Sequence, residues 1–79
     1  MSGDAADLTP DSATKIAHLR LSLQAAKRYG ASVRREWLDG RSGGACEVAG
    51  KRFLFVDLSL SIDEQIDQVE EAFRLWEQT

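Results

Sequence analysis

The sequence predicts a small α+β domain in which two helices flank three short strands. Apolar residues recur at helical spacing before Gly30 and again after Ser61, and alternating segments separated by glycines lie between these two regions. The economical arrangement of this α-β-β-β-α order is a two-layer sandwich. We expect a small antiparallel sheet with both helices packed on one of its faces.

The length of 79 residues allows one domain with a thin core. Residues 1–9 show no apolar periodicity and are expected to form a disordered tail, whereas residues 10–79 form the single α+β domain. The longest apolar run is far shorter than a membrane span. One cysteine and the lack of a signal-peptide pattern favour a reducing, cytoplasmic setting.

The first helix is predicted over residues 10–29. Thr9 is a suitable N-cap, and Pro10 suits the first helical position because its missing N–H has no partner there. Gly30 offers the left-handed residue that commonly ends a helix. Leu21 lies opposite the apolar stripe and is either an exposed leucine or part of a contact surface. The stripe expected to face the core consists of Ile16, Leu19, Leu23 and Ala26.

Residues 31–38 alternate as in a half-buried strand, with Trp37 marking its buried end. The glycine-rich residues 39–44 predict a flexible turn. A phosphate cradle is a poor alternative because the glycines lead into another strand rather than a helix. Residues 45–49 and 51–58 then form a β-hairpin with its turn at Gly50.

The last strand carries apolar side chains on both faces. Phe53 and Phe55 fall opposite Leu54 and Val56, so one of these pairs is not covered by the helices. A partner protein or a second copy of the chain could cover it, which makes a homodimer possible. Asp57 at the end of this strand is expected to organise the connection to the next helix.

The second helix begins at Ser61, because Ser61 and Glu64 have the spacing of a capping box. Acidic residues cover much of its remaining surface, and we interpret them as a solvated face. Leu75 lies outside the apolar stripe and joins Leu21, Phe53 and Phe55 as a candidate interaction surface. The stripe itself consists of Ile62, Ile66, Val69, Phe73 and Trp76.

Formal net charge is −3, with a positive excess in residues 15–52 and a negative excess in residues 53–79. Surface charge divided in this way could steer an acidic partner to one face and a basic partner to another, although the two halves also partly neutralise each other. The element order is also that of double-stranded-RNA-binding domains. Because the second helix starts with acidic residues, which repel phosphates, we expect no nucleic-acid partner. No membrane partner is expected either, because the apolar runs are too short to span a bilayer.

No catalytic constellation is evident, and we expect no catalytic residue, cofactor or metal. Cys46 shares a strand face with Val48 and is interpreted as a packed core position. The alternative is a reactive thiol, which needs a base or cation such as His18 close by. One cysteine and one histidine are too few for a zinc site of soft ligands.

From about Ala17 to Phe73 the chain resembles the front part of the ImmA/IrrE-type zinc metallopeptidases. The similarity comprises Gly30, the Gly44-Ala45-Cys46 hairpin entry, the Gly50-Lys51 turn and the apolar strand 53–56. The zinc-binding His-Glu-x-x-His motif of that family would fall on residues 70–74. Glu71 matches the general base, but Glu70 and Arg74 replace the two zinc histidines, so the resemblance implies a module without the metal.

The chain is also similar, over residues 30–73, to small bacterial proteins with a Gly-Gly-x-Cys hairpin, a group with no assigned activity. We therefore expect a small cytoplasmic, non-enzymatic domain that acts through protein contact, with self-association possible. Two alternatives stay open. One is a degenerate metallopeptidase-like module that binds peptide in an open groove beside Leu54, and the other is a thiol-dependent enzyme that uses Cys46.

Overall fold

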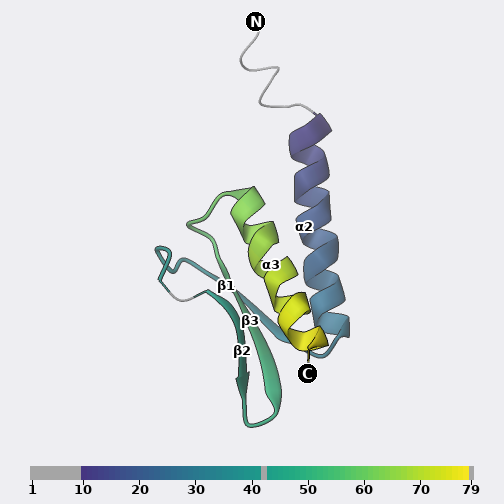
Figure 1. Cartoon of the computed structure of the whole chain (residues 1–79). Coiled ribbons are helices and arrows are strands. Elements are labelled where there is room, and N and C mark those ends of the chain that lie inside the picture. The colour runs from purple at the N-terminus through teal and green to yellow at the C-terminus, as the bar shows by residue number, and fades with distance from the viewer. Residues whose placement is uncertain (1–9, 42, 79) are drawn as a thin grey trace, which may run out of the picture.

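The computed structural model describes residues 10–41 and 43–78, and it has the α-β-β-β-α order expected from the sequence. Thr9 and the predicted tail 1–9 lie outside the described residues. The two helices lie side by side over one face of the sheet, which confirms the two-layer arrangement (Figure 1). The elements are α2 (Pro10–Arg28), β1 (Ser32–Glu36), β2 (Gly44–Val48), β3 (Lys51–Asp57) and α3 (Ile62–Glu77).

The sheet is mixed, so the prediction of an antiparallel sheet is wrong. Its strand order is β1-β3-β2. The β2–β3 hairpin is antiparallel, as expected, but β1 pairs with β3 in parallel, with Ser32 opposite Phe53 and Glu36 opposite Asp57. The reason is the path of the connection after β1, which places β2 on the far edge of the sheet. The hairpin then returns β3 into the centre in the same direction as β1 (Figure 1).

Local signals set the boundaries of the helices. At the end of α2, Gly30 has a φ of 100° and its N–H donates to the Lys27 carbonyl, while the Ala31 N–H donates to the Ala26 carbonyl. This is the Schellman pattern that glycine permits. At the start of α3, the Glu64 N–H donates to Ser61 Oγ and the Ser61 N–H donates to Glu64 Oε1, which confirms the capping box.

The core lies between the helices and the inner face of the sheet. Leu54 and Val56 are fully buried there, as is Val69 of α3. Leu19, Leu23 and Ala26 of the predicted α2 stripe are buried, but Ile16 is 47% exposed, so its assignment to the core is wrong. Ile16 lies beside the start of α3, where it borders a surface hollow together with Ser61 and Ile62. The remaining residues of the α3 stripe pack against the core: Ile62, Ile66, Phe73 and Trp76.

An aromatic cluster covers one end of the core, next to the C-terminal ends of α2 and α3. Trp76 is buried and stacks on Tyr29 with ring centroids 5.5 Å apart. Phe73 meets both rings edge to face, and the guanidinium of Arg52 lies 4.9 Å from the centre of the Tyr29 ring. Such ring pairs and cation–π contacts stabilise the fold beyond the area they bury. Among the described residues, no helix is long and apolar enough to cross a bilayer.

The turn between β2 and β3 places a non-glycine residue in the left-handed region. Ala49 has a φ of 54° and Gly50 a φ of 81°, and the turn joins the paired residues Val48 and Lys51. A two-residue turn with both φ angles positive favours asparagine before glycine, because alanine is strained there. The turn therefore contains a removable local strain at Ala49.

We expect Ala49→Asn to stabilise the protein by about 0.5–1 kcal/mol, because asparagine tolerates the left-handed conformation better than alanine. The measurement is the urea concentration at the midpoint of unfolding, which should rise while the dependence of the unfolding free energy on urea stays unchanged. Ala13→Asn, at an exposed position of α2, is the matched control and should cost about 0.5 kcal/mol of helix propensity. A lower midpoint for Ala49→Asn would contradict this account of the turn.

Candidate functional site

Asp57 is the most extensively hydrogen-bonded side chain among the described residues, and its carboxylate is fully buried at the end of β3. It accepts from the N–H groups of Leu38 at 2.9 Å and Gly40 at 2.6 Å, both in the β1–β2 connection. It also accepts from the Ser59 N–H at 2.9 Å and the Ser59 hydroxyl at 2.7 Å. Asp57 thus organises the strand-to-helix connection, as predicted, and fixes the β1–β2 connection as well.

These contacts determine the protonation state of Asp57. Burial raises the pKa of the carboxyl, but the Ser59 hydroxyl and the N–H groups of Leu38, Ser59 and Gly40 outweigh burial and lower the pKa from 3.8 to about 2. The side chain is therefore an anion whose acceptor sites are occupied by protein donors. Its contacts give Asp57 a structural role in fixing the two connections.

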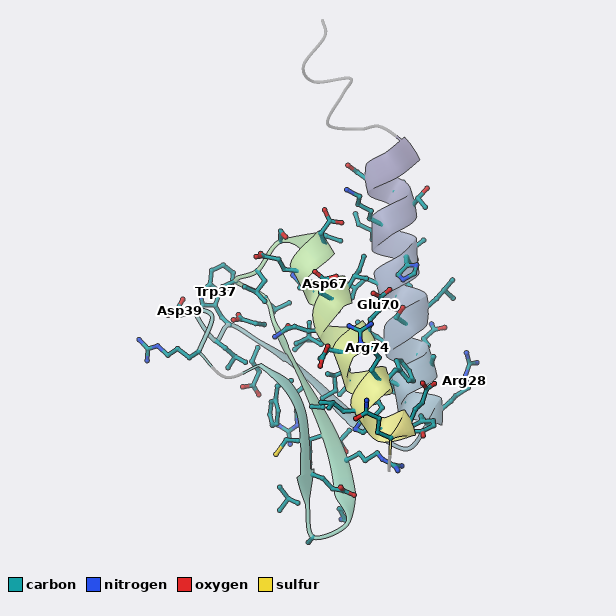
Figure 2. The ribbon with its side chains drawn as sticks, in the orientation of Figure 1. Arg28, Trp37, Asp39, Asp67, Glu70 and Arg74 are labelled. Carbon is teal, nitrogen blue, oxygen red and sulfur yellow. The ribbon has the colours of Figure 1, made fainter. Side chains whose placement is uncertain are left out.

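Trp37 lies beside this anchored connection, and its expected burial is wrong: the side chain is 68% exposed. The cause is that β1 ends at Glu36, the residue before Trp37, and the chain then turns toward Asp57. The Trp37 indole N–H donates to Asp39 Oδ1 at 2.9 Å. Figure 2 shows both side chains at the opposite side of the molecule from Arg28 on α2.

The glycine-rich connection is also held from the helix side. Gln68 of α3 accepts from the Asp57 N–H at 2.9 Å, and its amide lies against Gly43 so closely that a Cβ at Gly43 would collide with it. The carbonyl oxygen of Phe55 lies 3.2 Å from the same Cβ position. Gly43 therefore permits close packing, which the sequence pattern did not distinguish from a flexible turn.

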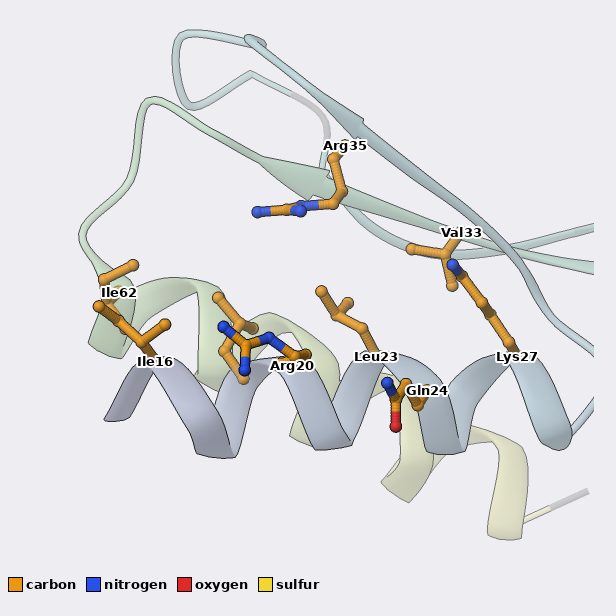
Figure 3. Close-up of a pocket in the computed structure, with 9 residues that line it drawn as sticks. Ile16, Arg20, Leu23, Gln24, Lys27, Val33, Arg35 and Ile62 are labelled. Atoms are coloured by element: carbon orange, nitrogen blue, oxygen red, sulfur yellow. The ribbon is translucent and has the colours of Figure 1, made fainter. Parts of the chain in front are cut away.

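A groove of about 420 Å³ runs between α2 and β1 (Figure 3). Three basic side chains line it: Arg20 and Lys27 from α2, and Arg35 from β1. In Figure 3 the guanidinium of Arg35 extends from β1 into the gap above α2, and Arg20 and Lys27 rise from α2 on either side of Leu23. The remaining residues that line it are mostly apolar: Ile16, Leu19, Leu23, Gln24, Val33 and Ile62.

The groove is electropositive because these three cations line it and no acidic side chain of the described residues does. Within residues 10–41 and 43–78, the ion pairs involve other cations: Lys15 with Asp63 at 3.2 Å, His18 with Glu70 at 3.5 Å, Arg34 with Glu36 at 3.9 Å and Arg74 with Glu71 at 3.0 Å. None of these pairs engages Arg20, Lys27 or Arg35. Three cations of the basic segment are therefore available to an anionic ligand at this groove.

One wall of the groove is an edge strand. Among the strands of the described residues, β1 pairs with β3 alone, so its other side has backbone donors and acceptors that no described strand occupies. The groove runs along Val33, the register partner of Leu54. The peptide-binding alternative required an open groove beside Leu54. In the structure the groove lies on the neighbouring strand β1, at Val33, whereas Leu54 itself is buried.

The outer face of the sheet is the second candidate surface. Phe53 and Phe55 are half-buried there, and their rings stack at 6.3 Å. Cys46 lies opposite Phe53 on β2 and is exposed, so its interpretation as a packed core residue is wrong. The reason is that the helices cover only the other face of the sheet, which carries Leu54 and Val56.

The other candidate surface residues do not join this patch. Leu21 on α2 is 61% exposed and Leu75 on α3 is 44% exposed, so both are accessible, as expected for a contact surface. Leu75 borders a shallow hollow of about 350 Å³ with Ala45 and Cys46. The four predicted residues therefore lie on three elements rather than in one continuous surface.

The structure does not bring Cys46 and His18 together. His18 lies in the helical layer beside Glu70, whereas Cys46 is on the edge strand β2. Glu70, Glu71 and Arg74, onto which the zinc-binding motif was expected to fall, are exposed on α3. Figure 2 shows Glu70 and Arg74 on this helix. Among the described residues, no cluster of three histidine, cysteine or acidic side chains could hold a metal ion.

The comparisons with known proteins add no family assignment. No family model, no curated protein and no solved structure matches this chain. The candidate site is thus defined by geometry and charge alone.

Proposed function

We propose that this chain is a small protein-binding domain without catalysis of its own, and that it binds an extended segment of a partner protein along β1 and the adjoining groove. The observation that carries the proposal is the combination of a free strand edge with an apolar groove under Arg20, Lys27 and Arg35. Strand addition gives affinity through the backbone, and the groove gives specificity through alternate side chains. This is the peptide-binding alternative suggested by the sequence, and it needs no metal.

The surroundings of the Asp57 carboxylate, the Cys46 thiol and the His18 imidazole support a non-enzymatic role. The carboxylate of Asp57 is occupied by four donors from the protein, and Cys46 and His18 lie on different layers. We place the domain in a cytoplasmic setting, because an exposed free thiol such as Cys46 is suited to a reducing compartment.

A second candidate function is self-association through the outer sheet face. The stacked Phe53 and Phe55 favour it, together with Val48, which is 55% exposed. From the strand spacing, a three-stranded face of this length offers about 300 Å². A stable dimer buries about 800 Å² on each partner, so this face alone supports only weak association.

The test is selection of random nine-residue peptides displayed on phage against the immobilised chain, followed by hydrogen exchange on the bound complex. We expect the selected peptides to protect the backbone amides of residues 32–36. Arg35→Glu should weaken their binding at least about tenfold through the charge reversal. Arg28→Glu makes the same charge change on α2 outside the groove and serves as the control. Protection confined to Phe53 and Phe55, or failure to select any peptide, would contradict the proposal.

A further inference from the structure

We propose that the segment bound at β1 contains two adjacent acidic residues next to an apolar one, and that Arg34 and Arg35 each hold one of the two carboxylates on opposite faces of the sheet. This inference rests on the proposed function and specifies its ligand. The partner is thus recognised by a short acidic-apolar motif in an extended conformation.

The alternation of β1 places the two arginines on different faces. Val33 and Arg35 are in register with Leu54 and Val56, whose side chains are buried on the helix side. Arg34 is in register with Phe55, which lies on the outer face. Arg35 accordingly lines the groove and Arg34 does not.

A strand added to the free edge of β1 would alternate in the same way. Side chains directly opposite each other on neighbouring strands have Cβ atoms about 5 Å apart and share a face. The residue opposite Arg35 therefore points to the groove, and the next residue, opposite Arg34, points to the outer face. Two consecutive acidic residues would each meet one guanidinium, which is suited to bidentate carboxylate binding.

Both arginines are available for this role. Within the described part of the chain, Arg35 forms no ion pair. Arg34 has only a contact of 3.9 Å with Glu36, and both side chains of that pair are about half exposed or more, at 62% and 49%. An exposed pair of this kind contributes little energy, so a bound carboxylate can replace it. Arg20 and Lys27 add positive charge on the groove side only.

The apolar part of the motif follows from the neighbouring position. The residue opposite Val33 points to the groove side, where the half-buried Val33 is itself part of the lining. An aliphatic side chain there would bury apolar surface that is now open to water. The apolar lining favours a peptide with an aliphatic side chain over a nucleic acid, whose affinity comes mainly from its phosphates.

The test uses two fluorescent eight-residue peptides as probes, with the core Leu-Glu-Glu or Glu-Glu-Leu, one for each strand direction. Binding is measured by fluorescence polarisation with the full chain. We expect one of the two peptides to bind. Arg34→Glu and Arg35→Glu should each weaken its binding at least about tenfold, whereas Arg28→Glu leaves it unchanged. Circular dichroism checks that all three variants are folded.

A charge swap assigns each contact. Replacing one glutamate of the peptide by lysine should restore binding to Arg35→Glu, and replacing the other should restore binding to Arg34→Glu, with no cross-rescue. Rescue of both variants by the same peptide would overturn the two-face assignment.

The remaining outcomes separate this inference from the proposed function. If a peptide with glutamine in place of both glutamates binds equally well and still protects residues 32–36, the acidic motif is wrong but strand addition stands. If no extended peptide protects β1, both are wrong. Tighter binding of a single-stranded oligonucleotide that is lost in Arg34→Glu and Arg35→Glu would overturn both in favour of nucleic acid.

Discussion

Replacing Asp57 by asparagine is expected to lower Tm by about 10 °C or more, one of the two largest effects of single substitutions considered for this chain. An asparagine side chain has one acceptor oxygen and one amino group. Because Oδ1 accepts from Leu38 and Ser59 while Oδ2 accepts from Gly40, the amino group must face a backbone or hydroxyl donor in either orientation. Thermal unfolding followed by circular dichroism measures the loss.

The matched control is Asp67→Asn on the exposed part of α3, which makes the same chemical change away from the connection (Figure 2). It should shift Tm by no more than a few degrees, because surface substitutions change stability little. Equal effects of the two substitutions would refute the role assigned to Asp57.

The same carboxyl makes stability depend on acid pH. The pKa of Asp57 is about 2 in the folded protein against an ordinary value of 3.8, so the unfolded chain binds the proton more tightly. The stabilising contribution of Asp57 is therefore complete above about pH 5 and is lost as the pH falls through about 4 toward 2. We expect the difference in Tm between wild type and Asp57→Asn to narrow across that interval. A difference that stayed constant or widened would show that the carboxylate is not the stabilising form.

Trp76→Ala is the second substitution with a large expected effect, costing about 3–5 kcal/mol of unfolding free energy. The side chain is buried between the ends of the two helices, where it contacts Tyr29 and Phe73. Because a domain of this length is only marginally stable, much of the variant should be unfolded at 37 °C. Urea unfolding followed by far-ultraviolet circular dichroism gives the change in free energy.

Trp37→Ala is the internal comparison, since Trp37 is the other tryptophan and is 68% exposed. Removing it should cost less than about 1 kcal/mol, because the side chain leaves no cavity. Before unfolding, the fluorescence of Trp76→Ala comes from Trp37 and should be that of a solvated indole. The fluorescence of Trp37→Ala comes from Trp76 and should be that of a buried indole. Similar losses of stability in both variants would contradict the placement of the two indoles.

The features that the sequence predicted well are those with a short-range cause. The capping box at Ser61 and the helix end at Gly30 depend on residues within one turn of each other. The separation of Phe53 and Phe55 from Leu54 and Val56 onto opposite faces follows from alternation along one strand, although alternation does not tell which pair the helices cover. Each of these patterns needs no knowledge of what lies across the fold.

The features that sequence reasoning missed depend on contacts distant in the chain. The parallel pairing of β1 could not be read locally, because it depends on which edge of β3 is left after the hairpin forms. The same applies to Cys46 and Trp37, whose exposure depends on which face the helices cover and on where β1 stops.

The groove had a sequence signal that was only partly used. Arg20 and Lys27 are seven residues apart and so share a face of α2, and Arg35 shares the strand face of Val33. The net charge of residues 15–52 indicated a basic excess, but it did not show that Arg20, Lys27 and Arg35 meet at one groove. Joining the two faces required the position of α2 relative to β1, which the structure supplies.

The central position of β3 has a consequence for the order in which the chain can fold during synthesis. β3 is the last strand to be made, yet both edge strands pair only with it. Among the described strands, no sheet can form until β3 starts to emerge at Lys51, and the adjacent hairpin then closes a much shorter loop than β1 does. β1 is therefore the strand expected to dock last, and the edge proposed to bind a partner belongs to it.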